Sequence, residues 1–282
     1  MATTPPKPTT TATVKKEGSG SSSIFASLVI PIAFVVALLI YIFVLGDPSH
    51  YKGGDPANEP ANGDYFGVVH KGGPIVPVLM TFLLCVIIFS IERFVVIGKA
   101  AGSGNVDAFI KKVQAYLNAG NIEAASAECD KQKGSVANVI KSGLKKYREM
   151  EQEPNLDVDQ KCLAIQKDIE EATSLEMPML EQNLTIIATL VSIGTLTGLL
   201  GTVTGMIKAF AALATSGAPN QAALATGISE ALINTALGIF TSTLAVIAYN
   251  YFTSKIDTLT YAIDETGFSI VQTYAASHKN NH

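Results

Sequence analysis

The chain has 282 residues, of which 48% are hydrophobic and only 16% are charged, and its mean hydropathy is +0.31. Soluble domains carry about 25% charged residues, so this composition excludes an ordinary soluble protein and favours an integral membrane protein. More than half of the charged side chains, 11 basic and 14 acidic, lie between Gly98 and Asn183, which indicates one water-exposed domain. The net charge of −4 gives no indication of a nucleic-acid partner.

The three cysteines, Cys85, Cys129 and Cys162, are odd in number and widely spaced, and they contain no C-x-x-C pair. This pattern predicts neither a disulfide framework nor a zinc site, and reduced thiols are the simplest interpretation. Nothing between Gly98 and Glu181 has the spacing of a phosphate loop, a metal site or a nucleophile. We therefore expect no cofactor, no metal and no enzymatic activity.

The first apolar segment follows a tail of Thr, Pro, Ser, Gly and Lys that is typical of disorder. Ile24–Leu45 is free of charge over 22 residues and contains Pro31. The apolar core of a secretory signal spans about 7–15 residues and ends in a small-x-small cleavage site. Because this segment is longer and ends in Gly46-Asp47-Pro48, we interpret it as a retained membrane helix, with cleavage as the alternative.

A polar stretch and a second apolar run come next. Asp47–Gly73 is rich in Gly, Pro, Asn and Asp and predicts an exposed loop. Pro74–Ile91 is uncharged and leads into Glu92-Arg93, Ile97 and Lys99, as expected for a spanning helix with a charged cytoplasmic end.

The charged region that follows has helical periodicity. Apolar residues recur at three- and four-residue spacing in two stretches: Phe109, Val113, Tyr116 and Leu117, then Val136, Val139, Ile140 and Leu144. Asn121 is a candidate helix cap, and Pro154-Asn155 marks a break. Leu156–Glu181 predicts a long helix that we expect to run straight into the next membrane segment.

Two further spans complete the chain. The third begins near Leu184 and ends at about Ala214, Thr215–Asn220 forms a turn, and the fourth is Gln221–Phe252. The predicted fold is an all-α, polytopic membrane helix bundle with a cytoplasmic helical domain. Its predicted parts are a disordered cytoplasmic tail (1–23), an extra transmembrane helix (24–45), a periplasmic loop (46–73), a transmembrane helix (74–97), the cytoplasmic helical domain (98–183), a transmembrane hairpin that lines the pore (184–254) and a cytoplasmic C-terminal tail (255–282). Basic residues at the span ends put both termini in the cytoplasm.

Glu230 is the candidate functional residue of the hairpin. Between Gln182 and Ser254 the chain carries only two charged side chains, Lys208 and Glu230. A charge at the bilayer centre costs about 2.5–3.5 kcal/mol on insertion scales, and intramembrane carboxylates usually serve ion or proton transport. A structural ion pair with Lys208 is the alternative, because both residues lie at a similar distance from the turn.

Small and polar residues surround this acid. Gly194, Gly198, Gly201 and Gly205 form a small-residue stripe that predicts close helix packing. In the fourth span, Asn234 and Thr241 share a face with Glu230, and Thr235 borders that face. Thr202 and Thr235 lie nearly equally far from the turn, each about 24 Å along its helix at about 1.5 Å per residue. We therefore expect Thr202, Glu230, Asn234, Thr235 and Thr241 to contribute to one polar track, although any single threonine can instead bond its own backbone.

Two segments of the hairpin carry a family resemblance. Gly198-Leu199-Leu200-Gly201-Thr202-Val203-Thr204-Gly205 resembles the G-L-F-G-T-V-W-G helix of the ExbB/TolQ/MotA proton-channel family, and of its ExbB members most closely. The second segment, Gly227-Ile228-Ser229-Glu230-Ala231-Leu232-Ile233-Asn234-Thr235-Ala236-Leu237-Gly238, is similar to the G-I-A-E-A-L-x-A-T-A-x-G helix of the same family, and Tyr249-Asn250 is similar to the Y-N that closes it. Lys71-Gly72-Gly73-Pro74 and Ile91-Glu92-Arg93 resemble the two ends of its usual first span. The resemblance covers about residues 72–256.

The resemblance implies a homopentamer in the bacterial inner membrane, surrounded by lipid, whose pore holds the helices of an ExbD-type single-span dimer. Proton flow through this complex would energise a TonB-type protein for outer-membrane transport. Thr202 and Thr235 match the pore threonines and Glu230 matches the intramembrane glutamate, whereas the proton-accepting aspartate belongs to the partner. The alternatives are a TolQ-type or gliding-motor subunit, or a non-conducting scaffold.

Three features depart from the family pattern. The span at Ile24–Leu45 is additional to the usual three, Thr195 and Leu244 stand where many members have proline, and Lys208 replaces a position that is usually uncharged. These departures bear on helix kinks and on the outer end of the pore.

Overall fold

The computed structural model describes residues 19–56, 58–215 and 221–278. The predicted tail therefore lies mostly outside the described residues, as does the predicted turn after Thr215. The helices are α1 (Ser19–Leu39), α2 (Tyr65–His70), α3 (Val76–Ala101), α4 (Val106–Asn118), α5 (Ile122–Gln132), α6 (Gly134–Glu151), α7 (Val158–Glu181), α8 (Leu184–Thr215) and α9 (Gln221–His278). Within the described ranges the chain is helical apart from loops and one isolated bridge between Tyr51 and Pro60.

Four described segments are long and apolar enough to cross a membrane, which confirms the predicted class of fold. They lie within Phe25–Leu45, Gly73–Asn118, Val158–Ala214 and Leu224–His278. Large apolar side chains remain exposed along them, as a lipid-facing surface requires. The protein is therefore an all-α membrane helix bundle.

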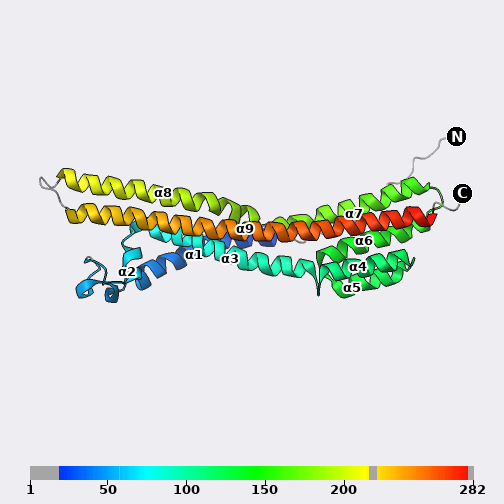
Figure 1. Ribbon diagram of the computed structural model, residues 1–282, viewed down its shortest axis with the longest axis horizontal. Coiled ribbons are helices and arrows are strands. Elements are labelled where there is room, and N and C mark those ends of the chain that lie inside the picture. Colours follow the sequence, from blue (N-terminus) through cyan, green and yellow to red (C-terminus); the bar gives the residue numbers. More distant parts are fainter. Residues whose placement is uncertain (1–18, 57, 216–220, 279–282) are drawn as a thin grey trace, which may run out of the picture.

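The molecule is elongated, and α9 runs along most of its length (Figure 1). Its first half packs antiparallel to α8, and its second half joins α4, α6 and α7 in a helical domain at the opposite end. Residues 255–278, predicted as a separate tail, instead continue this helix. Ile263, Ile270 and Tyr274 are buried in the domain, because apolar residues recur there at helical spacing.

The core of the helical domain follows the predicted periodicity. Val113 and Leu117 of α4 are buried, as are Val136, Val139, Ile140 and Leu144 of α6. Asn121 caps α5 as predicted, since its side chain accepts a hydrogen bond from the Ala124 amide at 2.9 Å. The chain also breaks around Pro154-Asn155, between the end of α6 at Glu151 and the start of α7 at Val158.

The expectation that the helix from Leu156 runs unbroken into the third span is wrong. α7 ends at Glu181, and Asn183 adopts a positive φ of 63° before α8 begins at Leu184. Arg93, a buried residue of α3, stabilises this break. Its Nη1 donates to the carbonyls of Met179 and Leu180, each at 3.0 Å, and so satisfies carbonyls at the end of α7.

The extra span is a helix over the whole predicted length. α1 contains Pro31 and continues as a π-helical segment, η1 (Ile40–Leu45), and α1 packs against α3. The polar segment after it is more ordered than an exposed loop suggests. It contains two 3₁₀ turns, η2 (Pro48–His50) and η3 (Lys52–Gly54), then α2, and a third 3₁₀ turn, η4 (Gly73–Ile75), leads into α3. We call the described residues of 46–71 the cap; it lies at the end of the bundle opposite the helical domain (Figure 1).

Candidate functional site

The glycine stripe of α8 lies against α9 of the same chain. A Cβ added at Gly194 would meet the Ser242 hydroxyl at 2.7 Å, and one at Gly205 would meet the Gly227 carbonyl at 2.8 Å. A Cβ added at Gly198 would meet the Asn234 carbonyl at 2.9 Å, and one added at Gly201 would collide with the Asn234 side chain. The absence of side chains on α8 thus brings the two backbones together, which places polar groups of α9 directly at the helix contact.

Glu230 lies on the edge of this contact that faces the start of α3. The residue is 8% exposed, and its Oε1 lies 2.5 Å from Lys208 Nζ on α8. A Cβ added at Gly73 would meet the same Oε1 at 2.5 Å, so the carboxylate rests directly on the Gly73 backbone. The alternative pairing of Glu230 with Lys208 is therefore present in the structure.

Asn234 lies one helical turn from Glu230 and is fully buried. Its Nδ2 donates to the Gly72 carbonyl at 2.8 Å, while its Oδ1 has no hydrogen-bond partner among the described residues. A buried acceptor of this kind costs free energy unless a water or another donor reaches it. Thr241 is also buried, and at about 20° around α9 from Glu230 it lies on the same face.

Thr202 and Thr235 lie on the other edge of the helix contact. Thr235 is five residues after Glu230, which corresponds to about 140° around the helix. It is half-buried, and its hydroxyl lies within hydrogen-bonding distance of the carbonyls of Ala231 (3.2 Å) and Gly198 (3.5 Å). Thr202, one turn after Gly198, is half-buried and donates to the Leu199 carbonyl at 2.6 Å.

Within one chain the structure therefore brings together Glu230, Asn234 and Lys208, and it leaves Thr202 and Thr235 on a separate, more accessible edge. The glycyl pair Gly72–Gly73 belongs to this site as well, and sequence reasoning did not identify it as a contact of Glu230. The sequence feature that could have pointed to this contact is the family resemblance of Lys71-Gly72-Gly73-Pro74. That resemblance marks the start of a span but does not indicate which helix packs against it. The arrangement can hold a carboxyl group next to polar atoms in an apolar layer, as proton transfer requires.

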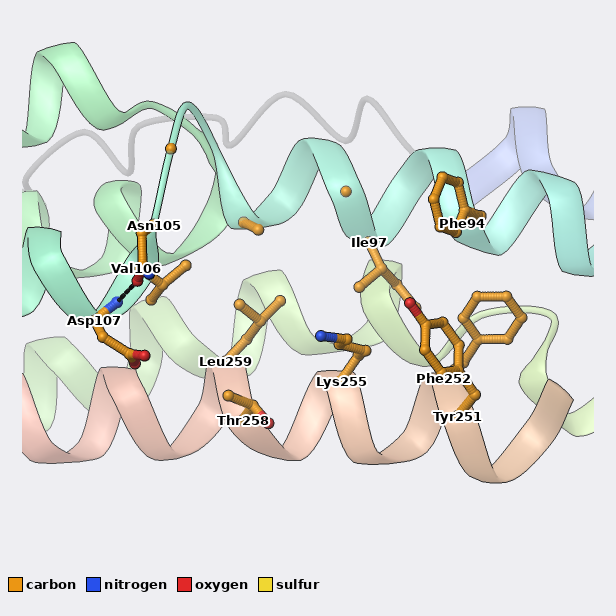
Figure 2. A pocket seen from close by; sticks show the side chains of 13 residues that line it. Phe94, Ile97, Asn105, Val106, Asp107, Tyr251, Phe252, Lys255, Thr258 and Leu259 are labelled. Carbon is orange, nitrogen blue, oxygen red and sulfur yellow. Dashed lines mark hydrogen bonds between the residues drawn. The ribbon is translucent and has the colours of Figure 1, made fainter. Parts of the chain in front are cut away.

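A cavity of about 590 Å³ lies elsewhere, between the end of α3, the start of α4 and the middle of α9. Figure 2 shows Phe94, Tyr251 and Phe252 on one side of it and Asp107 toward the other, with Lys255 between. Its lining residues include one basic and one acidic side chain and no histidine or cysteine. This cavity is distant in sequence from Glu230 and does not belong to the acid site.

A membrane helix bundle with a buried carboxylate in an antiparallel hairpin is the class of protein that these observations define. Comparison with known proteins gives the family. The chain belongs to the MotA/TolQ/ExbB proton channel family, whose model matches residues 131–265. The match includes the whole hairpin and most of the helical domain.

The curated relatives carry two names. The Tol-Pal system protein TolQ of Pseudomonas aeruginosa is 32% identical over 154 residues, which are 55% of this chain and 67% of that protein. The biopolymer transport protein ExbB of Xanthomonas campestris is 33% identical over 102 residues, 36% of this chain and 40% of that protein. A putative ExbB-like protein of Synechocystis is 34% identical over 88 residues, 30% of this chain and 42% of that protein. The chain thus spans two thirds of the first relative and well under half of the other two.

Proposed function

We propose that this chain is the ExbB-type subunit of an inner-membrane motor that uses the proton motive force to energise TonB-dependent outer-membrane transport. The observation that carries the proposal is Glu230, a nearly buried carboxylate in a spanning helix beside Lys208 and Asn234. Membership of a proton channel family supports a role of this acid in proton transfer.

The surroundings of Glu230 suit a carboxyl that exchanges protons. Lys208 Nζ lies 2.5 Å from Glu230 Oε1, and Asn234 Oδ1, which has no partner among the described residues, offers an acceptor one turn away. A proton that crosses the membrane field gains about 2.3 kcal/mol per 100 mV. This is comparable to the cost of about 2.5–3.5 kcal/mol for a charge at the bilayer centre, so the field can drive transfer through such a site.

The assembly that we propose is a homopentamer around an ExbD-type single-span dimer, with both termini and the helical domain in the cytoplasm. The accessible edge with Thr202 and Thr235 would face the pore, since half-buried hydroxyls can accept hydrogen bonds from water or from a partner helix. Glu230 and Asn234 lie on the opposite edge, toward α3. The proton-accepting aspartate would be supplied by the partner.

A TolQ-type function is the second candidate, and a specific observation favours it: the relative with the longest of the reported alignments is named as a Tol-Pal system protein. Deletion of the gene in its own host distinguishes the two. We expect loss of growth on iron supplied as a siderophore complex, restored by the wild-type gene and not by Glu230→Gln. Leakage of periplasmic enzymes with normal siderophore uptake would instead assign the TolQ role. A deletion with neither phenotype would contradict both.

A non-conducting scaffold remains the alternative from another class of function. Proteoliposomes that contain this chain and its single-span partner distinguish the scaffold from the channel. A proton flux that requires both proteins supports the proposal, whereas a stable complex without flux would support the scaffold.

A further inference from the structure

The position of Glu230 depends on the backbone of Gly72 and Gly73. Gly73 has a φ of +79°, and its missing Cβ leaves the space that the Glu230 carboxylate occupies. The Gly72 carbonyl accepts the hydrogen bond from Asn234 at 2.8 Å, and a Cβ on Gly72 would meet Ile233 at 2.9 Å. We call these two residues the glycyl seat. Any movement of the seat changes the surroundings of Glu230.

The residue two positions before Gly72 connects the seat to the extra span. The His70 carbonyl accepts a hydrogen bond from the Tyr41 hydroxyl at 3.1 Å, and the two rings are 4.5 Å apart between centroids. Tyr41 lies in the π-helical segment η1, a geometry that occurs often at functional sites.

A second tyrosine holds the imidazole of His70. The Tyr51 hydroxyl lies 2.5 Å from Nδ1 of His70 and 3.1 Å from the Leu45 carbonyl, and Tyr51 is only 4% exposed. The carbonyl can only accept, so for both hydrogen bonds to form the hydroxyl donates to Leu45 and His70 Nδ1 donates to the hydroxyl. Lys71, between His70 and the seat, donates to the Pro56 carbonyl at 2.8 Å.

We propose that the extra span and the cap position Glu230 for proton transfer by fixing His70 and thereby the glycyl seat. In this arrangement Tyr41, Tyr51 and His70 are positioning residues that do not touch the acid's proton. The inference rests on the proposed function for its purpose, but the geometry that it describes is testable without any proton flux. It gives α1 and η1 a role beyond their packing in the bundle.

The test measures how fast dicyclohexylcarbodiimide modifies Glu230 in the full-length protein, reconstituted in lipid, by mass spectrometry of the labelled peptide. This reagent reacts with carboxyl groups in apolar surroundings, so its rate reports changes around Glu230. We expect Tyr41→Phe and Tyr51→Phe, which remove only a hydroxyl, to change the labelling rate severalfold with little change in melting temperature. Tyr65→Phe is the matched control, because Tyr65 lies in the same cap with a side chain that is 83% exposed.

Substitutions at His70 and in the seat sharpen the test. His70→Leu should alter the labelling rate, and His70→Asn, whose amide can donate in place of Nδ1, should restore it. Gly73→Ala should alter the rate most, whereas Gly63→Ala carries similar backbone strain at a φ of +82° with nothing within 4 Å of the new Cβ.

Labelling rates equal to wild type in the tyrosine and His70 variants would overturn the inference. Rates that change only in proportion to a loss of melting temperature would overturn it too, because they would indicate a purely structural role. If instead the labelling changes as expected while wild-type proteoliposomes with partner conduct no protons, the proposed function fails and the positioning geometry stands.

Discussion

The ion pair between Glu230 and Lys208 is asymmetric in its burial. The Glu230 side chain is 10% exposed, whereas the Lys208 side chain is 53% exposed and lies seven residues before the end of α8. A lysine near a helix end can extend its long side chain so that the charged ammonium group reaches the membrane surface. The glutamate, held against Gly73, has no comparable freedom. The charge of Glu230 therefore depends more on Lys208 for compensation than the charge of Lys208 depends on Glu230.

This asymmetry predicts different costs for the two single substitutions. Removal of one member of a fully buried pair costs about 3–5 kcal/mol, because the other charge is left uncompensated. We expect Lys208→Gln to approach this loss and Glu230→Gln to cost about 1 kcal/mol or less, since the exposed lysine can relax. The measurement is the thermal stability of the assembled protein in lipid nanodiscs.

The double variant Glu230→Gln/Lys208→Gln completes the cycle. We expect it to recover most of the stability that Lys208→Gln loses, without any recovery of energy-dependent uptake. An unstable Glu230→Gln protein that regains both stability and uptake in the double variant would show that the glutamate is only a structural partner of the lysine.

The threonines provide a second residue-scale prediction. Thr202→Val and Thr235→Val replace hydroxyls on the accessible edge with methyl groups of similar size, so proton flux with the partner should fall about tenfold, the effect of about 1.4 kcal/mol on a barrier. Thr204→Val is the matched control, because its hydroxyl also bonds backbone carbonyls, those of Leu200 and Gly201, but on the other side of α8. Equal flux in all three variants would argue against a pore-facing edge.

At the scale of elements, Arg93 connects α3 to the break between α7 and α8. The guanidinium is 1% exposed; besides the two carbonyls of α7 it bonds the Glu92 carboxylate through Nε and Nη2, and Asn183 Nδ2 donates to Glu92 at 3.3 Å. These donors point in directions that a lysine ammonium cannot reproduce. One side chain thus connects α3 to the junction at which α8 leaves the helical domain.

Arg93→Lys should therefore destabilise the protein by about 3 kcal/mol, because buried carbonyls lose charged donors while the charge remains. Arg148→Lys is a suitable control, since Arg148 is 43% exposed and lies 3.9 Å from Glu123. Chemical denaturation in mild detergent measures the loss of stability in each of the two variants. A loss at Arg93 no larger than that at Arg148 would contradict the role assigned to this junction.

The titratable groups of the cap predict that its stability depends on pH. Burial, together with the neighbouring charge of Lys71, lowers the pKa of His70 below its usual value. As pH falls through about 6.5, the unfolded chain takes up the proton before the folded cap does, so the cap loses stability. Hydrogen bonds from His50 and from backbone amides lower the pKa of Asp64, and that contribution is present at higher pH and is lost as pH falls through the lowered value.

Hydrogen exchange at residues 46–72, corrected for the intrinsic effect of pH, measures how the stability of the cap changes with pH. We expect protection to fall between pH 7.5 and 5.5 in the wild type and to fall less in His70→Asn, which cannot titrate there. Amides of α6 serve as the internal reference. Identical pH dependence in the two proteins would exclude His70 as its source.

Across the whole molecule, the spans were predictable because runs of apolar residues long enough to cross a bilayer are a strong local signal. The break at Asn183 was not predictable, since its contacts come from Glu92 and Arg93 of a distant helix. The Gly72–Asn234 contact joins residues 162 positions apart, and no periodicity encodes it. The cap was read as a loop because Gly, Pro and Asn signal turns, while its order comes from tyrosine and histidine contacts that composition does not show.

The length of α9 has a consequence for the molecule as a whole. One helix carries Glu230 near its start and Tyr274, buried in the helical domain, near its end. One continuous helix therefore connects the acid site to the helical domain (Figure 1). A motor that converts proton transfer into movement requires a connection of this kind.

We propose that this chain conducts protons together with a single-span partner through the site of Glu230. The most direct measurement is proton flux into proteoliposomes that hold the chain and its single-span partner, driven by a potassium diffusion potential. We expect a flux that needs both proteins, disappears with Glu230→Gln and persists with Thr204→Val. A flux that survives Glu230→Gln in a fully assembled complex would contradict a role of Glu230 in proton conduction.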